Sequence, residues 1–267
     1  MDLMENQNET NEREKNWLLP ASIVIAAVLI AGAVIYSTGL KNIQRPTNNQ
    51  TEQNTEQNAT PTSSGPQIGD DVVLGNADAP ITLIEFGDFQ CPFCAKFYKE
   101  IEEPLITKYV KTGKIKMVYK PLAFLDRQSP IKESQAAVNA VKCAQEQGKF
   151  WEYHDAIFEI EYAEVEKVLS GQLSSNEGNG NLNRDLFKKI ASDLKMNVDE
   201  FLSCYDSKRH QNDFQKYMDE AESVLPQGIS TPSVFINGKH FEFSMNAQRE
   251  FDFTAFSAAI DTVLNKK

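Results

Sequence analysis

The chain carries two closely spaced cysteines, Cys91 and Cys94, within the stretch EFGDFQCPFCAKFY (85–98). They follow an apolar run and precede a helical pattern. Such a pair could be a redox couple, half of a metal site or a structural bridge. In the first turn of a helix, the helix dipole and the free backbone N–H groups favour a thiolate. We therefore expect Cys91 to be a nucleophile and Cys94, one turn further along, to be its shielded partner.

The other two uses fit the sequence less well. A zinc site needs two further ligands, ideally a second closely spaced pair. Cys143 and Cys204 stand far from each other in the sequence, and no histidine lies at a ligand spacing. A bridge within CPFC would close too short a loop to add much stability. We therefore predict a redox couple that needs neither a metal nor a cofactor.

An apolar run near the N-terminus indicates the compartment. Residues 17–36 contain no charged side chain and are long enough, as a helix, to cross a bilayer. Trp17 and Tyr36 bracket the run, as aromatic residues at membrane interfaces often do. The alternative is a cleavable signal peptide, with a small-residue site at 31–33. Either interpretation sends the remaining chain across a membrane, to the periplasm or the cell surface.

The segments around this run are polar. Residues 1–16 are expected to form a cytoplasmic tail, and residues 37–66, rich in Asn, Gln, Thr and Pro, a flexible linker. The folded domain is expected over residues 67–267. The formal net charge of −11 argues against a nucleic-acid partner, because phosphate binding needs a surplus of Lys and Arg.

The first half of this domain has an alternating pattern of strands and helix. Short strands are predicted in DVVLG (71–75) and at 81–86, followed by a helix over 94–110 that Pro104 should kink. The stretch 114–120 predicts the next strand. This order indicates a βαβ unit with a right-handed crossover.

The second half begins with a helical block at about 128–226. Two short strands follow within 233–243, joined by Asn237-Gly238, a strong signal for a type I′ hairpin. A final helix is predicted at about 252–265. The fold class is therefore α/β, with a helical insertion.

Three stretches resemble the DsbA-like branch of the thioredoxin superfamily: IEFGDFQCPFC (84–94), FWEYHDAIF (150–158) and TPSVFINGK (231–239). The resemblance covers about residues 67–267. It implies a thioredoxin fold with a helical insertion between the β-α-β and β-β-α halves. It also implies an enzyme that oxidises the thiols of exported proteins.

The resemblance assigns roles to individual residues. Cys91 matches the exposed nucleophile of the family and Cys94 its buried partner. Thr231-Pro232 matches the cis-proline loop beside the cysteines. Glu85 matches a buried acid that could assist proton transfer to or from Cys94. The alternative for Glu85 is a carboxylate at a strand end that faces solvent.

Two positions depart from the family pattern. Phe93 replaces the histidine found in the most oxidising members, so the Cys91 thiolate should be less favoured here. Ser230 stands where many relatives carry glycine. The redox potential, and with it the direction of exchange, is therefore left open.

The remaining two cysteines, Cys143 and Cys204, lie in the helical block. The resemblance implies that they form a second, structural disulfide, which is compatible with an oxidising compartment. The alternative is a relay pair that exchanges with Cys91 and Cys94. His154 lies in an aromatic helix segment and is expected to be a packed residue without a catalytic role.

The predicted function is a thiol-disulfide oxidoreductase that introduces disulfides into exported proteins. The resemblance implies re-oxidation by a membrane quinone-linked oxidase of the DsbB or VKOR type. One alternative is a disulfide reductase or isomerase, although no separate dimerisation domain is visible. Another is a chaperone-like binding module whose cysteines are incidental.

Overall fold

The computed structural model describes residues 65–266. The predicted tail (1–16), the predicted membrane anchor (17–36) and nearly all of the predicted linker (37–66) lie outside this range. Within residues 65–266, none of the helices has the length and apolar character that a bilayer crossing requires.

A four-stranded sheet forms the centre, in the order β2-β1-β3-β4. Its strands are β1 (Ile81–Asp88), β2 (Ile115–Leu122), β3 (Ser233–Ile236) and β4 (Lys239–Phe241). β1 and β2 run parallel, whereas β3 is antiparallel to both β1 and β4. Asn237 and Gly238 both have positive φ, at 49° and 78°, so the predicted hairpin turn is confirmed.

The strand predicted at 71–75 is wrong. Leu74 makes only an isolated antiparallel bridge with Met117 of β2, through two backbone hydrogen bonds of 2.9 and 3.0 Å. Gly75 follows with φ at 96°, a conformation outside the range of a β-strand, so the pairing ends there.

Most of the chain connecting β1 to β2, from Pro92 to Val110, is helical. It comprises α2 (Pro92–Phe97), a π-helical turn (Tyr98–Glu102), α3 (Glu103–Leu105) and a second π-helical turn (Ile106–Val110). Pro104 lies at the start of α3, between the two wider turns. A proline cannot donate the usual backbone hydrogen bond, and the pattern of the helix changes on both sides of it.

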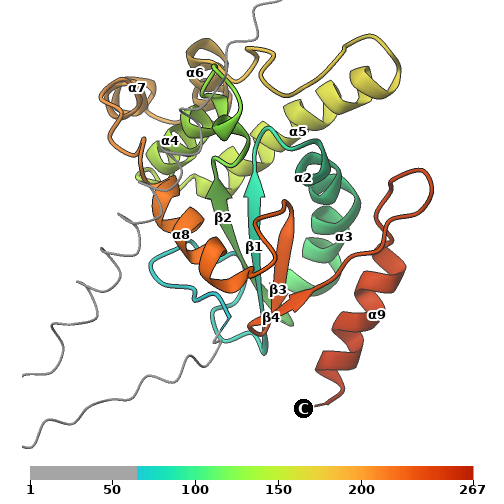
Figure 1. The fold of residues 1–267 in the computed structure, drawn as a ribbon. Helices are drawn as coiled ribbons and strands as arrows, with labels where there is room; N and C mark the ends of the chain where they lie inside the picture. Colours follow the sequence, from blue (N-terminus) through green and yellow to red (C-terminus); the bar gives the residue numbers. More distant parts are fainter. Residues whose placement is uncertain (1–64, 267) are drawn as a thin grey trace, which may run out of the picture. The chain divides into compact units, whose positions relative to one another are not determined.

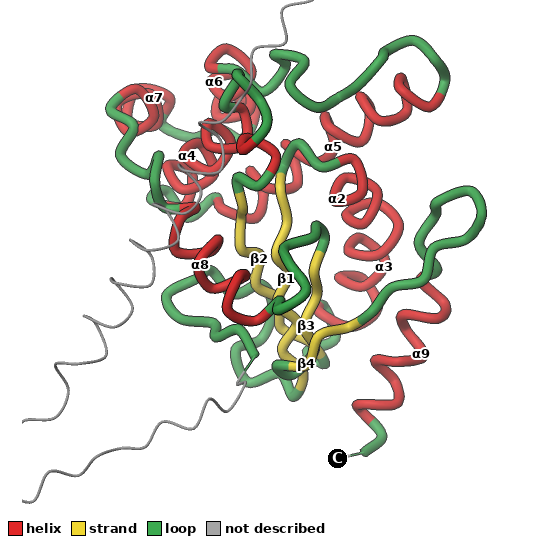
Figure 2. Tube along the Cα trace, in the orientation of Figure 1, coloured by secondary structure: helices red, strands yellow, loops and turns green. Residues whose placement is uncertain are grey.

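A helical insertion separates β2 from β3. It contains α4 (Glu133–Gln145), α5 (Phe150–Leu169), α6 (Arg184–Asp193), α7 (Val198–Asp206) and α8 (Phe214–Val224). A long loop joins α5 to α6 (Figure 2). After the hairpin, α9 (Phe253–Leu264) ends the described chain, in agreement with the final helix predicted at 252–265.

Two apolar clusters cover the two faces of the sheet. Leu83 of β1 belongs to the larger cluster, which includes side chains of α2, α5 and α9. Its neighbour Ile84 points to the opposite face, where Met218 and Ala221 of α8 pack. Figure 1 shows α8 on one side of the strands and α2, α3 and α9 on the other. Both faces are buried, as the apolar character of the central strands predicts.

Candidate active site

The cysteine pair lies where β1 gives way to α2. Cys91 is the N-cap residue of α2, with an extended backbone, and Pro92 is the first helical residue. The Cys91 N–H donates to the Asp88 carbonyl at 3.0 Å, and the Ala95 N–H donates to the Cys91 carbonyl at 3.1 Å. These contacts hold the Cys91 side chain at the positive end of the helix.

The two sulfur atoms have different surroundings. Cys91 is 5% exposed, whereas Cys94 is fully buried, and they are not bonded to each other, so the structure describes the dithiol form. A hydrogen bond with the Cys94 side chain is the main cause that lowers the pKa of Cys91. Burial raises the pKa of Cys94 well above its ordinary value. Cys91 is therefore the thiol that ionises first.

The loop before β3 lies against Cys91. Its thiol donates to the Thr231 carbonyl, with 3.5 Å between sulfur and oxygen. The Thr231–Pro232 peptide bond is cis, as the resemblance implies. Two segments that are 140 residues apart thus meet at one sulfur atom.

Glu85 does not face solvent, so that alternative is wrong. It lies in β1 between Tyr119 of β2 and Val234 of β3 and is only 1% exposed. Burial raises the pKa of Glu85 to about 8. Interaction with the nearby Glu102 side chain partly offsets this rise in the pKa. Within residues 65–266, neither carboxyl group has a hydrogen-bond partner.

Sequence reasoning missed two polar residues that precede Cys91. Asp88, fully buried, accepts hydrogen bonds from the Gln90 N–H at 3.0 Å, the Ser134 hydroxyl at 2.7 Å and the Leu125 N–H at 3.0 Å. Burial raises the pKa of Asp88 to about 6. A polar side chain at the end of an otherwise apolar strand is the signal that could have identified it.

Gln90 connects the cysteine pair to the α5–α6 loop. Its carbonyl accepts from the Asn176 side chain at 3.0 Å, and its side-chain oxygen accepts from the Gly178 N–H at 2.7 Å. Its side-chain nitrogen donates to the Ser134 hydroxyl at 3.0 Å. The residue directly before Cys91 is therefore held by the helical insertion.

Cys143 and Cys204 are joined by a disulfide between α4 and α7, with 5.8 Å between their Cα atoms. Each residue is 1% exposed. This bridge closes while Cys91 and Cys94 remain open in the same structure. The arrangement agrees with the pairing that the resemblance implies.

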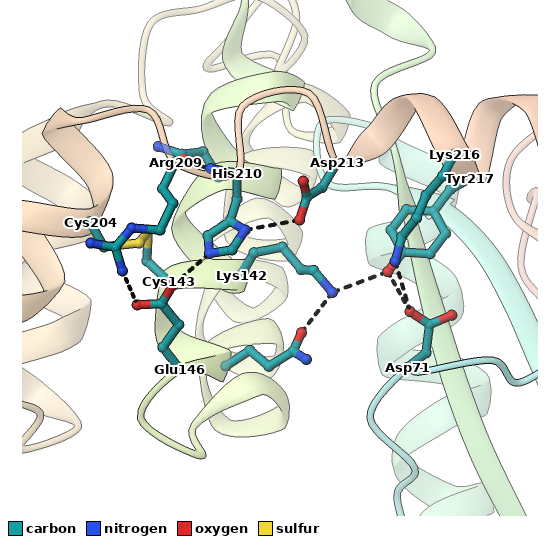
Figure 3. Close-up of polar contacts among 12 residues, drawn as sticks. Asp71, Lys142, Cys143, Glu146, Cys204, Arg209, His210, Asp213, Lys216 and Tyr217 are labelled. Atoms are coloured by element: carbon teal, nitrogen blue, oxygen red, sulfur yellow. Dashed lines mark hydrogen bonds and ion pairs between the residues drawn. A yellow bond between two sulfur atoms is a disulfide. The ribbon is translucent and has the colours of Figure 1, made fainter.

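His210 lies beside this disulfide, a proximity that its position in the sequence does not reveal (Figure 3). One of its ring nitrogens is 2.8 Å from Glu146 and the other is 2.9 Å from Asp213. A nitrogen of His210 and the two sulfur atoms lie within 4.8 Å of one another. The sulfurs are bonded to each other, so they are not thiolates that could bind a metal.

A second group of polar side chains in Figure 3 connects the segment before β1 to the helical insertion. Lys142 donates to the Tyr217 hydroxyl at 3.1 Å, and that hydroxyl donates to Asp71. Lys120 of β2 is buried and forms ion pairs with Asp71 at 2.8 Å and with Glu220 at 2.7 Å. These contacts fix the segment before β1 against α8.

Comparisons with known proteins agree with this geometry. Residues 67–262 match a family model described as Thioredoxin. The chain is 26% identical over 256 residues to "Probable disulfide bond formation protein D" of Bacillus anthracis, which covers 95% of this chain and 100% of the relative. It is 28% identical over 193 residues to disulfide bond formation protein D of Bacillus subtilis (strain 168), covering 72% of this chain and 77% of the relative.

Solved structures support the fold. Oxidised BdbD from Bacillus subtilis has a TM-score of 0.57 and 21% identity, covering 76% of this chain and 97% of that chain. DsbA from Chlamydia trachomatis has a TM-score of 0.56 and 17% identity, covering 76% of this chain and 95% of that chain. The match to the family model spans most of the chain, and both of these Bacillus relatives are named disulfide bond formation protein D. The chain belongs to the thioredoxin family and is a protein disulfide oxidoreductase.

Proposed function

We propose that the enzyme introduces disulfides into exported proteins, with Cys91 as the attacked and attacking sulfur. The observation that carries this proposal is the contrast between the two thiols. Cys91 caps a helix and has a lowered pKa, whereas Cys94 is fully buried and has a raised pKa. A pair of this kind favours the state in which Cys91 is a thiolate and Cys94 a thiol.

The reaction is thiol-disulfide exchange. A substrate thiolate attacks the Cys91 sulfur of the oxidised pair, and Cys94 leaves as a thiolate that takes up a proton. A second substrate thiolate attacks the substrate sulfur of the mixed disulfide, and Cys91 leaves. Two electrons pass from the substrate to the enzyme. The substrate gains one disulfide, and the enzyme is left as the dithiol.

Thr231 and Pro232 would position the substrate. The Thr231 carbonyl reaches the Cys91 thiol, and the proline beside it has no N–H that could compete for the sulfur. An extended substrate segment could then pair with the backbone of this loop. The absence of an N–H at Pro232 also leaves the Cys91 thiolate of the reduced enzyme free to react with the disulfide of the re-oxidising partner.

Glu85 would supply or accept the proton at Cys94. It is buried, its pKa of about 8 lies near neutrality, and a charge on it raises the pKa of Cys94. An acid with a pKa close to the working pH is effective in either direction of proton transfer. The role of Cys143 and Cys204 is then structural, because their disulfide joins two helices of the insertion.

The cellular context follows from the resemblance and from the N-terminal sequence. Residues 17–36 would anchor the chain, with the catalytic domain outside the cytoplasm. Thiol-containing exported proteins are the proposed substrates. A membrane quinone-linked oxidase of the DsbB or VKOR type is the proposed partner that restores the Cys91–Cys94 disulfide.

The direction of exchange is tested by a redox titration. The chain is equilibrated in glutathione buffers, alkylated, and analysed by peptide mass spectrometry, which separates the Cys91–Cys94 pair from Cys143–Cys204. An oxidase predicts a potential of about −180 mV or higher, whereas a value near −270 mV is that of a reductase such as thioredoxin. The lower value would contradict the proposed direction and support the reductase alternative.

A further inference from the structure

The peptide unit that joins Gln90 to Cys91 is held at both of its polar ends. The Cys91 N–H donates to the Asp88 carbonyl at 3.0 Å, and the Gln90 carbonyl accepts from Nδ2 of Asn176 at 3.0 Å. Because a peptide unit is planar, these two contacts together fix its rotation. The first contact is local, whereas the second comes from the α5–α6 loop, 86 positions further along the chain.

The rotation of this peptide unit helps to determine where the Cys91 sulfur lies. The φ angle of Cys91, −72°, relates the preceding peptide unit to the Cα atom that carries the side chain. In this conformation the sulfur is 3.5 Å from the Thr231 carbonyl. The hydrogen bonds that lower the pKa of Cys91, first with the Cys94 side chain and then with Thr231, depend on this position. The contact that fixes the Gln90 carbonyl therefore affects the nucleophile.

Asn176 has a fixed orientation of its own. It is 3% exposed, and its Nδ2 also lies 3.3 Å from one carboxyl oxygen of Glu161 in α5, so its two N–H groups have one acceptor each. The other oxygen of Glu161 accepts from the Asn181 side chain, in the same loop, at 2.6 Å. The buried carboxyl group thus directs the Asn176 amide toward Gln90.

Further contacts keep the α5–α6 loop next to Gln90. The Gln90 side chain accepts from the Gly178 N–H at 2.7 Å and donates to the Ser134 hydroxyl of α4 at 3.0 Å. Glu133 of α4 accepts from two backbone N–H groups of the loop, at 3.2 and 2.9 Å. None of these bonds involves Cys91, so the position of the loop does not depend on the cysteine.

We propose that Asn176 is a positioning residue for disulfide exchange, which orients the Cys91 sulfur by holding the Gln90 carbonyl. This inference rests on the proposed function, because it concerns the sulfur that reacts. Asn176 acts through Gln90 and not on the sulfur itself. The ionisable groups around these residues are Glu85 and Asp88 of β1, Cys94 of α2, Asp126 of the turn Leu125–Arg127, Glu133 of α4 and Glu161 of α5.

The test is the pH profile of Cys91 alkylation. In the full-length chain in detergent, the Cys91–Cys94 pair is reduced with dithiothreitol, and the rate of reaction with iodoacetamide is followed from pH 3 to 9. Peptide mass spectrometry places the label on Cys91 and confirms that Cys143 and Cys204 remain joined. We expect Asn176→Ala to raise the midpoint of the profile by about half a unit, because the thiolate loses part of its hydrogen bonding.

This change has a form that a purely structural role would not produce. Below the midpoint the alkylation rate of Asn176→Ala should fall about threefold, which is the loss of thiolate that half a pKa unit corresponds to. Well above the midpoint Cys91 is a thiolate in both chains, so the two rates should agree within about twofold. A variant that only loosens the loop would keep the midpoint of the wild type.

Asn181→Ala is the matched control. Asn181 bonds to Glu161 from the same loop and is not a partner of Gln90. Its midpoint should stay within about 0.2 unit of the wild type. An unchanged midpoint in Asn176→Ala, or an equal rise in both variants, would overturn the inference. A wild-type midpoint near that of an ordinary thiol, about 8.5, would count against the proposed function instead.

Asn176→Thr keeps the test decisive if Asn176→Ala does not fold. Threonine fills about the same volume as asparagine, so the packing of the loop is largely retained. Its hydroxyl is attached at Cβ and ends one bond short of the Nδ2 position, so it does not replace the bond to Gln90. We expect alkylation below the midpoint to slow about twofold, with the same recovery at high pH. A folded Asn176→Thr chain with the midpoint of the wild type would overturn the inference.

Discussion

The two cysteine pairs of this protein use the same side chain in opposite ways. Cys91 and Cys94 are three residues apart, and their surroundings push their pKa values in opposite directions. Cys143 and Cys204 are 61 residues apart and are joined between two helices. The first pair can store and release a bond, whereas the second constrains a long stretch of chain. The surroundings of a cysteine, more than its identity, decide between exchange and stability.

The pKa values of the glutamates near the two cysteine pairs are also shifted in opposite directions. Burial raises the pKa of Glu85, near the first pair, to about 8. Glu146 lies near the second pair. Its slight burial acts to raise its pKa, but the hydrogen bonds with His210 and Arg209 outweigh this effect and lower the pKa. An acid with a pKa near neutrality therefore lies close to the cysteines that exchange, whereas an ordinary surface ion pair lies close to the structural disulfide.

The largest expected effect is on activity. Cys91→Ser should reduce the oxidative refolding of a reduced substrate protein to the uncatalysed rate, because the nucleophilic sulfur is lost. The free energy of unfolding of the dithiol form should change by less than about 1 kcal/mol, since a hydroxyl replaces a thiol at nearly the same size. Full refolding activity in this variant would support the binding-module alternative.

For the second cysteine pair we expect the opposite result, a large effect on stability and a small effect on activity. Replacing both Cys143 and Cys204 with Ser should lower the free energy of unfolding by about 4 kcal/mol, the value expected for a loop of this length. Refolding activity at 25 °C should stay within about threefold of the wild type. Denaturant titration measures the first quantity. A large loss of activity in a chain that is still folded would favour the relay-pair alternative instead.

The pH dependence of the free energy of unfolding should distinguish the contribution of Glu85 from that of Glu146. The folded pKa of Glu85 is raised from 4.5 to about 8, so its stabilising contribution is full below about pH 4.5 and is lost as the pH rises through 8. At about 1.4 kcal/mol per pKa unit, with part of the penalty relieved by relaxation, Glu85 should account for a loss of about 2 kcal/mol in the dithiol form between pH 5 and 9. Glu85→Gln should reduce the total loss in urea titrations by this amount, whereas Asp88, Glu102 and Glu161, whose pKa values are also raised, should keep their share.

Glu146→Gln is the control for this prediction. Because the folded pKa of Glu146 is lowered, its contribution is present above about pH 4.5 and is lost as the pH falls. The variant should therefore keep the loss of stability at alkaline pH. A Glu85→Gln chain that still shows the full alkaline loss would contradict the assignment to Glu85.

The smallest expected effect concerns the residue between the cysteines. Phe93→His would place a cationic ring beside Cys91 and should lower its thiol pKa by about one unit. The thiolate absorbance of the variant and of the wild type, followed at 240 nm against pH, measures this shift. An unchanged midpoint would show that Phe93 does not limit the stability of the thiolate.

Much of the fold could be predicted because its signals are local. The apolar run of β1, the turn at Asn237-Gly238 and the helical block each depend on neighbouring residues, and the structure agrees with them. The error at 71–75 has the same origin. A strand needs a partner along its length, and the sequence does not show that Gly75 turns the chain after one bridge.

The site was less accessible to sequence reasoning where distant segments meet. The pattern at Cys91 and Cys94 identified the pair, but nothing in the spacing places Glu102 against Glu85 or His210 against the disulfide. These contacts depend on how the helix after Cys94 and the insertion pack on the sheet. Burial is also a property of the whole fold, so the raised pKa of Glu85 could not be read from its neighbours in the chain.

The bonds between Gln90 and the α5–α6 loop affect how this domain could be redesigned. Asn176 and Gly178 donate hydrogen bonds to Gln90, the residue before the nucleophile, from a loop more than 80 positions away in the sequence. A chimera that transplanted the CPFC helix alone, or exchanged the insertion for that of another scaffold, would lose the hydrogen bonds between Gln90 and this loop. The loop and Gln90 should therefore be inherited or grafted together, as one module.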